Sequence, residues 1–187
     1  MQTIKINLDK VSDAEIELIV KYLQNGKVIA YPTDTVYGLG GDARDARAIK
    51  QINKIKGERR GKSFIWLISD YKMLKQYCLV NKEQEKYLKK IWPGPVTVVL
   101  DGKKNKNSLA VRLPKNDFLI KIISKAGFPI VSTSLNRTGK PVLTNVKNIE
   151  KYFKYLPDLI VGAGTIKGKQ SRLVDIREME NIKVIRK

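Results

Sequence analysis

The residues best suited to binding a ligand follow a short hydrophobic stretch at residues 27–31. Pro32 ends this stretch, and the string PTDTVYGLGGDA then supplies hydroxyls, carboxylates and three glycines, with Thr33 and Asp34 at its start. Hydroxyls and glycines after a predicted strand are typical of a ligand loop, because glycine permits backbone shapes that side chains exclude. The same residue types also form ordinary turns, so this loop alone leaves a purely local role open.

A second group of neutral hydrogen-bonding side chains ends another predicted strand, at residues 129–133. Ser132, Ser134 and Asn136 lie within the string VSTSLNRTGK. Hydroxyls and an amide beside a glycine can surround phosphate or carboxylate oxygens without any metal ligand. The sequence therefore predicts an anion-binding loop here, with an Asn-capped turn before Pro141 as the alternative.

Basic residues in three places could balance the charge of such an anion. The run KIKGERRGK at residues 54–62 lies at the end of a predicted helix. Lysines and arginines there either neutralise a triphosphate or only complement the helix C-terminus. Arg112 follows an apolar strand and Arg186 follows the last predicted strand, and each taken alone also fits a solvated surface charge.

Helices and strands that alternate along the chain must position these loops. A Ser12 to Glu15 capping box opens a helix that Gly26 ends. Further helices are predicted at 46–56, 72–79, 82–91, 117–126 and 147–155. Further strands are predicted at 63–69, 96–100, 108–113, 158–161, 172–176 and 182–186. With 187 residues, 42% of them hydrophobic, and no internal repeat, the sequence predicts one mixed α/β domain over residues 1–187.

Several classes of chemistry are excluded by composition. The chain has no histidine, so it can build neither a Ser-His-Asp triad nor a histidine-based zinc site, and no metal-ligating side chains are predicted. Cys78 is the one cysteine and can form no intramolecular disulfide, which favours a reducing compartment. No stretch is apolar enough for a signal peptide or a membrane span. We expect a soluble, cytoplasmic protein with no membrane partner.

The charge is strongly unbalanced. Thirty-seven Lys and Arg residues against 18 Asp and Glu give a formal net charge of +19 and a pI near 10.0. Such a surface attracts polyanions, and the candidates are a nucleoside triphosphate, RNA or an acidic membrane face. Many of the lysines also fit a merely solvated surface, and the clearest case is one predicted helix face with Lys82, Lys86, Lys89 and Lys90.

Four sequence blocks together resemble the threonylcarbamoyl-AMP synthase family, also called the YrdC-like domain. Pro32 to Gly40 fits the opening motif of the family at every position. WPGPVT at residues 92–97, AVR at 110–112 and the block at 131–141 follow in the family's order. The resemblance runs from about residue 27 to the end and suits the short, single-domain form. It implies a twisted mixed sheet, flanked by helices, around a basic concave cleft.

The resemblance also implies a reaction and its participants. L-threonine, bicarbonate or CO2, and ATP with bound Mg²⁺ would give L-threonylcarbamoyl-AMP and pyrophosphate. A separate threonylcarbamoyl transferase complex would then place the threonylcarbamoyl group on the adenosine beside the anticodon of tRNA. Weak binding of tRNA through the basic surface is a further expectation.

Family roles transfer to this chain residue by residue. The resemblance assigns catalysis to Lys56, Ser134 and Asn136. It assigns threonine binding to Thr33, Arg112, Ser132 and Ser171. It assigns ATP binding to Lys56, Arg59, Arg60, Lys62, Ser108, Ser134, Asn136 and Arg186. The stretch WPGP at residues 92–95, which begins with Trp92, is interpreted as a structural turn and core anchor rather than a binding element.

Two positions depart from the family pattern. Glu58 stands where the family has an arginine, so either Arg59 or Arg60 replaces it or the nucleotide is bound less tightly. Arg172 stands where the Ser-Thr-x-x-Asp block of the family has threonine.

Two other classes of function remain open. An RNA-binding module without turnover would bind tRNA or double-stranded RNA with a steep salt dependence. A phosphosugar enzyme of the related riboflavin-pathway synthase fold would need an acidic metal site. Only Asp34 and Asp42 lie near the first loop, and this last alternative ranks lowest.

Overall fold

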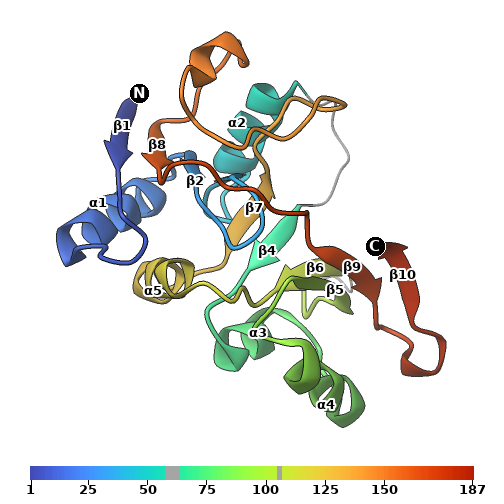
Figure 1. Cartoon of the computed structure of the whole chain (residues 1–187). Helices are drawn as coiled ribbons and strands as arrows, with labels where there is room; N and C mark the ends of the chain where they lie inside the picture. Colours follow the sequence, from blue (N-terminus) through green and yellow to red (C-terminus); the bar gives the residue numbers. More distant parts are fainter. Residues whose placement is uncertain (58–63, 105–106) are drawn as a thin grey trace.

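Strand β7 joins the two halves of a mixed sheet at the centre of the molecule (Figure 1). The computed structural model describes residues 1–57, 64–104 and 107–187, and within these ranges ten strands form one sheet in the order β1-β8-β2-β3-β7-β4-β6-β5-β9-β10. The strands are β1 (Gln2–Lys5), β2 (Ile29–Tyr31), β3 (Gly38–Gly40), β4 (Ile65–Leu67), β5 (Val96–Asp101), β6 (Ser108–Arg112), β7 (Ile130–Ser134), β8 (Leu159–Gly162), β9 (Arg172–Asp175) and β10 (Lys183–Arg186).

The sheet contains both parallel and antiparallel pairs of strands. β8 pairs parallel with β1 and β2, β4 with β6, and β5 with β9. The remaining neighbours, including both partners of β7, are antiparallel. The predicted mixed α/β architecture is therefore confirmed, whereas β1 and β3 had not been predicted.

The helices largely follow their local signals. They are α1 (Asp13–Gln24), α2 (Ala46–Lys56), α3 (Tyr71–Tyr77), α4 (Lys82–Ile91) and α5 (Asp117–Ala126), with 3₁₀ turns η1 (Ile149–Lys151) and η2 (Met179–Asn181). The predicted capping box at Ser12 is present, and Gly57 ends α2 in the left-handed conformation with φ of 66°.

The predicted helix at 147–155 is wrong, because only η1 forms there. Asn148 adopts a left-handed conformation with φ of 57°, which an α-helix cannot include. Pro157 further disfavours a helical conformation in the residue before it.

Two apolar clusters cover opposite faces of the sheet. One contains side chains of α1, α3, α4 and α5, and the other contains side chains of α2 and the segment around η1. Neighbouring residues of β2, Ala30 and Tyr31, belong to different clusters, as do Ile130 and Val131 of β7. Since side chains alternate along a strand, this division shows that both faces of the central strands are buried.

The glycines of the first loop have a different use from the one predicted. Gly38 and Gly40 form β3 inside the sheet, and neither they nor Gly41 has a positive φ. A Cβ at Gly40 would lie 1.9 Å from the carbonyl oxygen of Val131. Glycine is therefore required by the close approach of β3 and β7 rather than by an unusual backbone shape.

We expect Gly40→Ala to lower the free energy of unfolding by about 1–3 kcal/mol, because the new methyl group must displace the backbone of β7. Urea unfolding measures this loss. Gly127→Ala is the control, since Gly127 has φ of 80° but nothing within 4 Å of a new Cβ, and its cost is limited to the conformational strain of about 1 kcal/mol. Equal stability of the Gly40→Ala and wild-type proteins would contradict the close strand contact.

Trp92 and Cys78 are both buried in the first cluster. The Trp92 indole donates a hydrogen bond to the carbonyl of Val96 at 2.6 Å, which confirms its predicted role as a core anchor. Within the described residues, we find no helix with the length and apolar character needed to cross a membrane.

Burial raises the pKa of the Cys78 thiol to about 12. The reactive thiolate is then about one part in ten thousand at pH 8, and we expect the folded protein to resist a thiol reagent such as dithionitrobenzoate at that pH. The same protein in urea should react fully. Because the folded-state pKa exceeds the ordinary value of 9.0, the contribution of this group to stability is present below about pH 9 and is lost as the pH rises toward 12. Rapid labelling of the native protein at pH 8 would show that the thiol is accessible.

Candidate active site

A pocket of about 320 Å³ opens where the loop after β2, the ends of β4, β6 and β7, and the β9–β10 hairpin meet. This volume is within the range of pockets that hold small ligands. It is lined by Thr33, Thr35, Val36, Gly38, Lys56, Phe64, Ile65, Leu67, Ala110, Arg112, Ser132, Thr133, Ser134, Asn136, Thr138, Gly139, Gln170, Ser171, Leu173 and Arg186.

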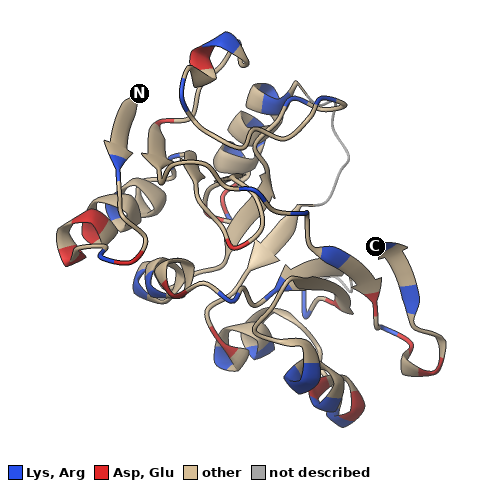
Figure 2. Cartoon of the chain, viewed as in Figure 1, with Lys and Arg blue, Asp and Glu red and all other residues tan. Residues whose placement is uncertain are grey.

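Three cations and no carboxylate belong to this lining among the residues that the structure describes: Lys56, Arg112 and Arg186. The remaining polar groups are hydroxyls and amides. The predicted basic cleft is therefore present. Other positive charges are spread widely over the helices and loops, as Figure 2 shows, and the four lysines of α4 are exposed as predicted. The charge inside the pocket is thus distinct from that of the general surface.

Arg112 is the more deeply buried of the two pocket arginines, Arg112 and Arg186, and has 4% of its surface exposed. Its Nε donates to the Gly94 carbonyl at 2.9 Å and its Nη1 to Thr35 Oγ1 at 3.3 Å. Its Nη2 donates to Asp34 Oδ2 at 2.6 Å. A guanidinium carries five N–H groups, so one on each Nη is left for a ligand.

Burial lowers the pKa of the Arg112 guanidinium, and the Asp34 carboxylate opposes this shift. The carboxylate also accepts a hydrogen bond from the backbone N–H of Lys115 at 3.2 Å. Arg112 keeps its charge, because an arginine pKa starts far above neutrality. Asp34 and Gly94 thereby hold the side chain in place. The sequence had placed Asp34 in the candidate ligand loop without a specific role, and Gly94 had not been predicted as a site residue.

Lys56 organises the loop after β7. Its Nζ donates to the carbonyls of Ser134 and Asn136 at 3.0 and 3.1 Å, and to Asn136 Oδ1 at 3.1 Å. Ser134 Oγ donates to the same Oδ1 at 2.7 Å, while Asn136 Nδ2 donates to the Lys140 carbonyl at 2.6 Å. The three residues predicted for catalysis therefore form one connected group on the pocket wall.

Thr33 and Ser132 also line the pocket. The Thr33 hydroxyl donates to the Val36 carbonyl at 2.5 Å and accepts from the backbone N–H groups of Thr35 and Val36. Thr33 thus closes its own loop, which is the local role that the sequence had left open. Ser132 lies two residues before Ser134 on β7, so both side chains point to the same face of the sheet.

Ser171 and Arg186 complete the opposite wall. The Ser171 hydroxyl lies 2.8 Å from Thr97 Oγ1. The backbone carbonyl of Ser171 accepts hydrogen bonds from Arg186 Nε and Nη2 at 2.9 and 2.7 Å. Burial lowers the pKa of Arg186. Gln170 accepts from Arg186 Nη1 at 3.0 Å and also lines the pocket, although the sequence carried no signal that singled it out.

A bulge in β10 aims Arg186 into the pocket. Val184 pairs with Val174, but Arg186 rather than Ile185 pairs with Leu173, so one residue is inserted. Directly paired residues of antiparallel strands point to the same face, and Leu173 lines the pocket. Without the bulge, Ile185 would occupy this position.

Of the remaining predicted residues, the structure describes Ser108 alone. Ser108 is exposed at the far end of β6 from Arg112, about 13 Å away along an extended strand, and does not line the pocket. Its predicted contact with ATP is not supported. Arg59, Arg60 and Lys62, together with Glu58, lie outside the described residues, and their roles stay predictions.

Comparisons with known proteins show what the chain is similar to. The family model Sua5_yciO_yrdC, described as "Telomere recombination", matches residues 21–187. The threonylcarbamoyl-AMP synthase of Pyrococcus abyssi is 31% identical over 187 residues, which are 94% of this chain and 55% of that protein. The enzyme of the same name from Nitrosococcus oceani is 31% identical over 172 residues, covering 87% of this chain and 92% of the relative.

Solved structures give the same picture. The crystal structure of P. abyssi Sua5 complexed with L-threonine superposes with a TM-score of 0.85 at 29% identity, covering 94% of this chain and 54% of that one. Escherichia coli YciO superposes with a TM-score of 0.89 at 26% identity, covering 100% and 95%. The twisted mixed sheet inferred from the sequence is confirmed by both. The chain spans about half the length of the P. abyssi relative and 43% of one from Bacillus subtilis.

We expect Arg112 and Asp34 to be strongly coupled, because the buried Arg112 guanidinium cannot exchange its carboxylate partner for water without cost. A double-mutant cycle with Arg112→Met and Asp34→Asn, measured by urea unfolding, should give a coupling energy of about 1–3 kcal/mol. The surface pair of Arg177 and Asp175, at 2.7 Å, is the matched control and should give less than about 1 kcal/mol. Similar coupling in the two pairs would contradict the structural role given to Asp34.

Proposed function

The chain belongs to the Sua5/YciO/YrdC family, and on this premise we propose that it makes L-threonylcarbamoyl-AMP and pyrophosphate from L-threonine, bicarbonate or CO2, and ATP. The observation that carries the proposal is the convergence of Lys56, Arg112 and Arg186 on one pocket without an opposing carboxylate in the described lining. The threonine carboxylate, the carbamate formed on the threonine amine and the ATP phosphates all bring negative charge, and fixed cations stabilise that charge without reorganisation.

Arg112 is the group best placed to bind the carboxylate of threonine. Its remaining N–H groups, one on each Nη, can form the paired hydrogen bonds that a carboxylate favours. The P. abyssi relative was solved in complex with L-threonine, which supports an amino-acid substrate for this pocket. The neighbouring hydroxyls of Ser132 and Ser171 are proposed to contact the same substrate.

The two walls that carry Ser134 and Arg186 suit the nucleotide. Ser134 and Asn136, held by Lys56, offer neutral polar groups, and Arg186 offers a guanidinium that donates to the neutral oxygens of Ser171 and Gln170. We assign the phosphates of ATP to these groups. They share one pocket of about 320 Å³ with Arg112, so reacting groups on the two substrates would be held close together.

The chemistry requires no histidine. The amine of threonine forms an N–C bond with CO2 and releases a proton, which gives a carbamate. A carbamate oxygen then attacks the α-phosphorus of ATP, and the bond from that phosphorus to the β-phosphate bridging oxygen breaks to release pyrophosphate. The chain's own residues bind and orient the reactants and balance charge as it moves from the carbamate to the leaving group.

Mg²⁺ is proposed as part of the nucleotide substrate. Among the described residues no three His, Cys, Asp or Glu side chains gather to hold a metal, and the Asp34 carboxylate is paired with Arg112. Phosphate oxygens and water are the ligands that Mg²⁺ prefers in such complexes. The residues present therefore fit an ion that enters with ATP rather than one held by the protein.

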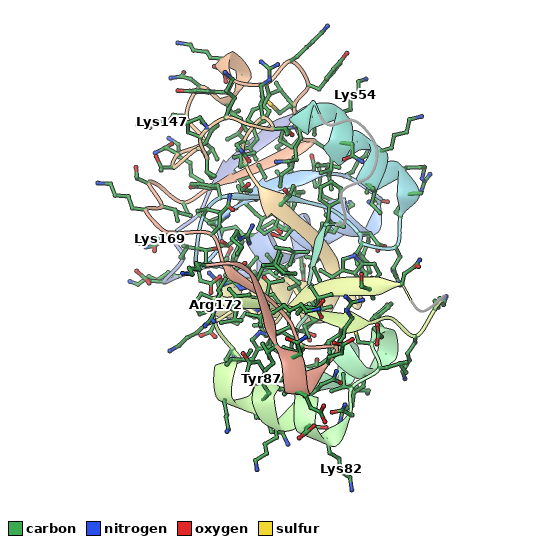
Figure 3. The ribbon with its side chains drawn as sticks, turned by 90° about the vertical axis from the view of Figure 1, so that its right-hand side faces the viewer. Lys54, Lys82, Tyr87, Lys147, Lys169 and Arg172 are labelled. Carbon is green, nitrogen blue, oxygen red and sulfur yellow. The ribbon has the colours of Figure 1, made fainter. Side chains whose placement is uncertain are left out.

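The product is an activated acyl adenylate, and its proposed consumer is a separate transferase complex that modifies tRNA. The net charge of +19 favours an additional weak contact with tRNA. In Figure 3 the labelled side chains Lys147, Lys169 and Arg172 follow one another along one side of the molecule, with Lys54 near the top. RNA binding without turnover is the second candidate function, favoured by this charge alone.

To test the proposed reaction, purified protein is incubated with labelled bicarbonate, ATP and Mg²⁺, with and without L-threonine. We expect threonine-dependent pyrophosphate release together with an equal amount of labelled adenylate. Absence of both products, beside salt-sensitive binding of tRNA, would replace the synthase proposal with the RNA-binding one.

The threonine assignment is tested with Arg112→Lys, which keeps a positive charge but loses the planar fork and the contact of Nε with Gly94. We expect kcat/KM for threonine to fall about 10- to 100-fold, which corresponds to the loss of one charge-assisted interaction. Arg177→Lys, on the surface hairpin, is the control and should retain wild-type kinetics. Unchanged kinetics in Arg112→Lys would remove threonine from this part of the pocket.

A further inference from the structure

The segment at residues 163–171, here called the strap, crosses the sheet from β8 to β9 (Figure 1). Its start is fixed by Tyr37, whose hydroxyl accepts from the Ala163 N–H at 2.8 Å and donates to the Gly164 carbonyl at 2.9 Å. Further along, the Ile166 N–H donates to the Thr144 carbonyl at 2.8 Å. The strap therefore has a defined path although most of its residues are exposed.

The middle of the strap, at Gly168, packs closely against the loop after β2. A Cβ at Gly168 would lie 1.8 Å from the carbonyl oxygen of Thr35, so a residue with a side chain could not pass here without moving that loop. Thr35 is the residue whose hydroxyl accepts from Arg112. This contact fixes the position of the strap against the first loop. Gln170, two residues after Gly168, then lines the pocket.

Gln170 connects the two walls of the pocket. Its Nε2 donates to Ser134 Oγ at 3.2 Å, and its Oε1 accepts from Arg186 Nη1 at 3.0 Å. Through Ser134 this link continues to Asn136 and Lys56, and through Arg186 it continues to Ser171. One side chain thus joins the group proposed for the phosphates on β7 to the arginine proposed for them on β10.

The two partners require a carboxamide. Ser134 already donates its hydroxyl hydrogen to Asn136, so it can only accept from Gln170. Arg186 can only donate, so it requires an acceptor. A glutamate side chain would offer acceptors to both partners, and an apolar side chain would offer neither a donor nor an acceptor.

We propose that Gln170 is a positioning residue for the nucleotide, which holds Ser134 and Arg186 at a fixed separation across the pocket. This inference rests on the proposed function for its choice of ligand. Gln170 acts through its two partners, and its neutral amide leaves the charge of Arg186 uncompensated. Within the described part of the chain, Arg186 donates to neutral oxygens, namely those of Ser171 and Gln170.

The test compares Gln170→Met, which keeps the length but removes both hydrogen bonds, with Gln170→Glu. We expect Gln170→Met to lower kcat/KM for MgATP about tenfold, while KM for threonine stays within about twofold because the contacts of Arg112 are untouched. Gln170→Glu should lower kcat/KM for MgATP at least as much. It places an anion beside the phosphates and removes the hydrogen-bond donor to Ser134 Oγ. Thr165→Val is the matched control, because it removes one hydrogen bond of the strap, to Asn145, away from the pocket.

A second measurement separates this inference from the proposed reaction. In the ligand-free protein, amide hydrogen exchange near residue 170 and in the loop after β7 should quicken about tenfold in Gln170→Met relative to wild type. Gln170→Met should lower kcat/KM for MgATP by a smaller factor in the Ser134→Ala background than in the wild-type background. The reason is that Gln170 and Ser134 act through the one hydrogen bond between them.

The outcomes are distinguishable. Unchanged exchange and unchanged kcat/KM for MgATP in Gln170→Met would overturn the role of Gln170 while wild-type adenylate synthesis still stood. No adenylate from wild-type protein would overturn the proposed reaction and the nucleotide role of Gln170 together. If Gln170→Met lowered kcat/KM equally for MgATP and for threonine, and Thr165→Val lowered both by the same factor, the Gln170 side chain would act only on general folding.

Discussion

Burying the Arg112 guanidinium below the pocket requires three separate parts of the chain to converge on it. The loop after β2 supplies Asp34 and Thr35, the turn before β5 supplies the Gly94 carbonyl, and β6 supplies the arginine itself. A charge that is 4% exposed loses most of its hydration, and these contacts replace that water with protein oxygens. The fold thus fixes the position of the cation while two of its N–H groups remain for a ligand.

The rest of the site is arranged around β7. This strand pairs with β3 on one side and β4 on the other, so its end lies in the middle of the sheet. Its alternation directs Ser132 and Ser134 to one face, and Lys56 from the end of α2 holds the loop that follows. A helix end and a central strand therefore meet at the group proposed for the phosphates. A shift of β7 would disturb the buried clusters on both faces, and a shift of α2 would disturb the second cluster.

Much of this arrangement could be predicted from local sequence. The bounds of α2 follow from a terminal glycine, and the polar residues of the two loops stand out because hydroxyls and amides follow apolar stretches. The pairing of Asp34 with Arg112 joins residues 78 positions apart and has no local signal. Strand β3 has only three residues, two of them glycine, and shows no periodicity. The direction of Arg186 depends on a single inserted residue, and Gln170 is an ordinary polar residue of a connecting segment until its position is known.

The placement of Arg186 on the outermost strand ties ligand binding to local folding. β10 has a partner on one side only, and edge strands open at a lower free energy than the centre of a sheet. When β10 separates from β9, Arg186 leaves the pocket, Ser171 and Gln170 lose their donor, and one wall is incomplete. A ligand held by Arg186 stabilises the paired state by mass action, so occupancy of the pocket and order at the edge of the sheet are one linked equilibrium. The affinity measured for such a ligand therefore includes the cost of closing the strand, and a change in the hairpin far from the pocket can alter that affinity without touching any residue that lines it.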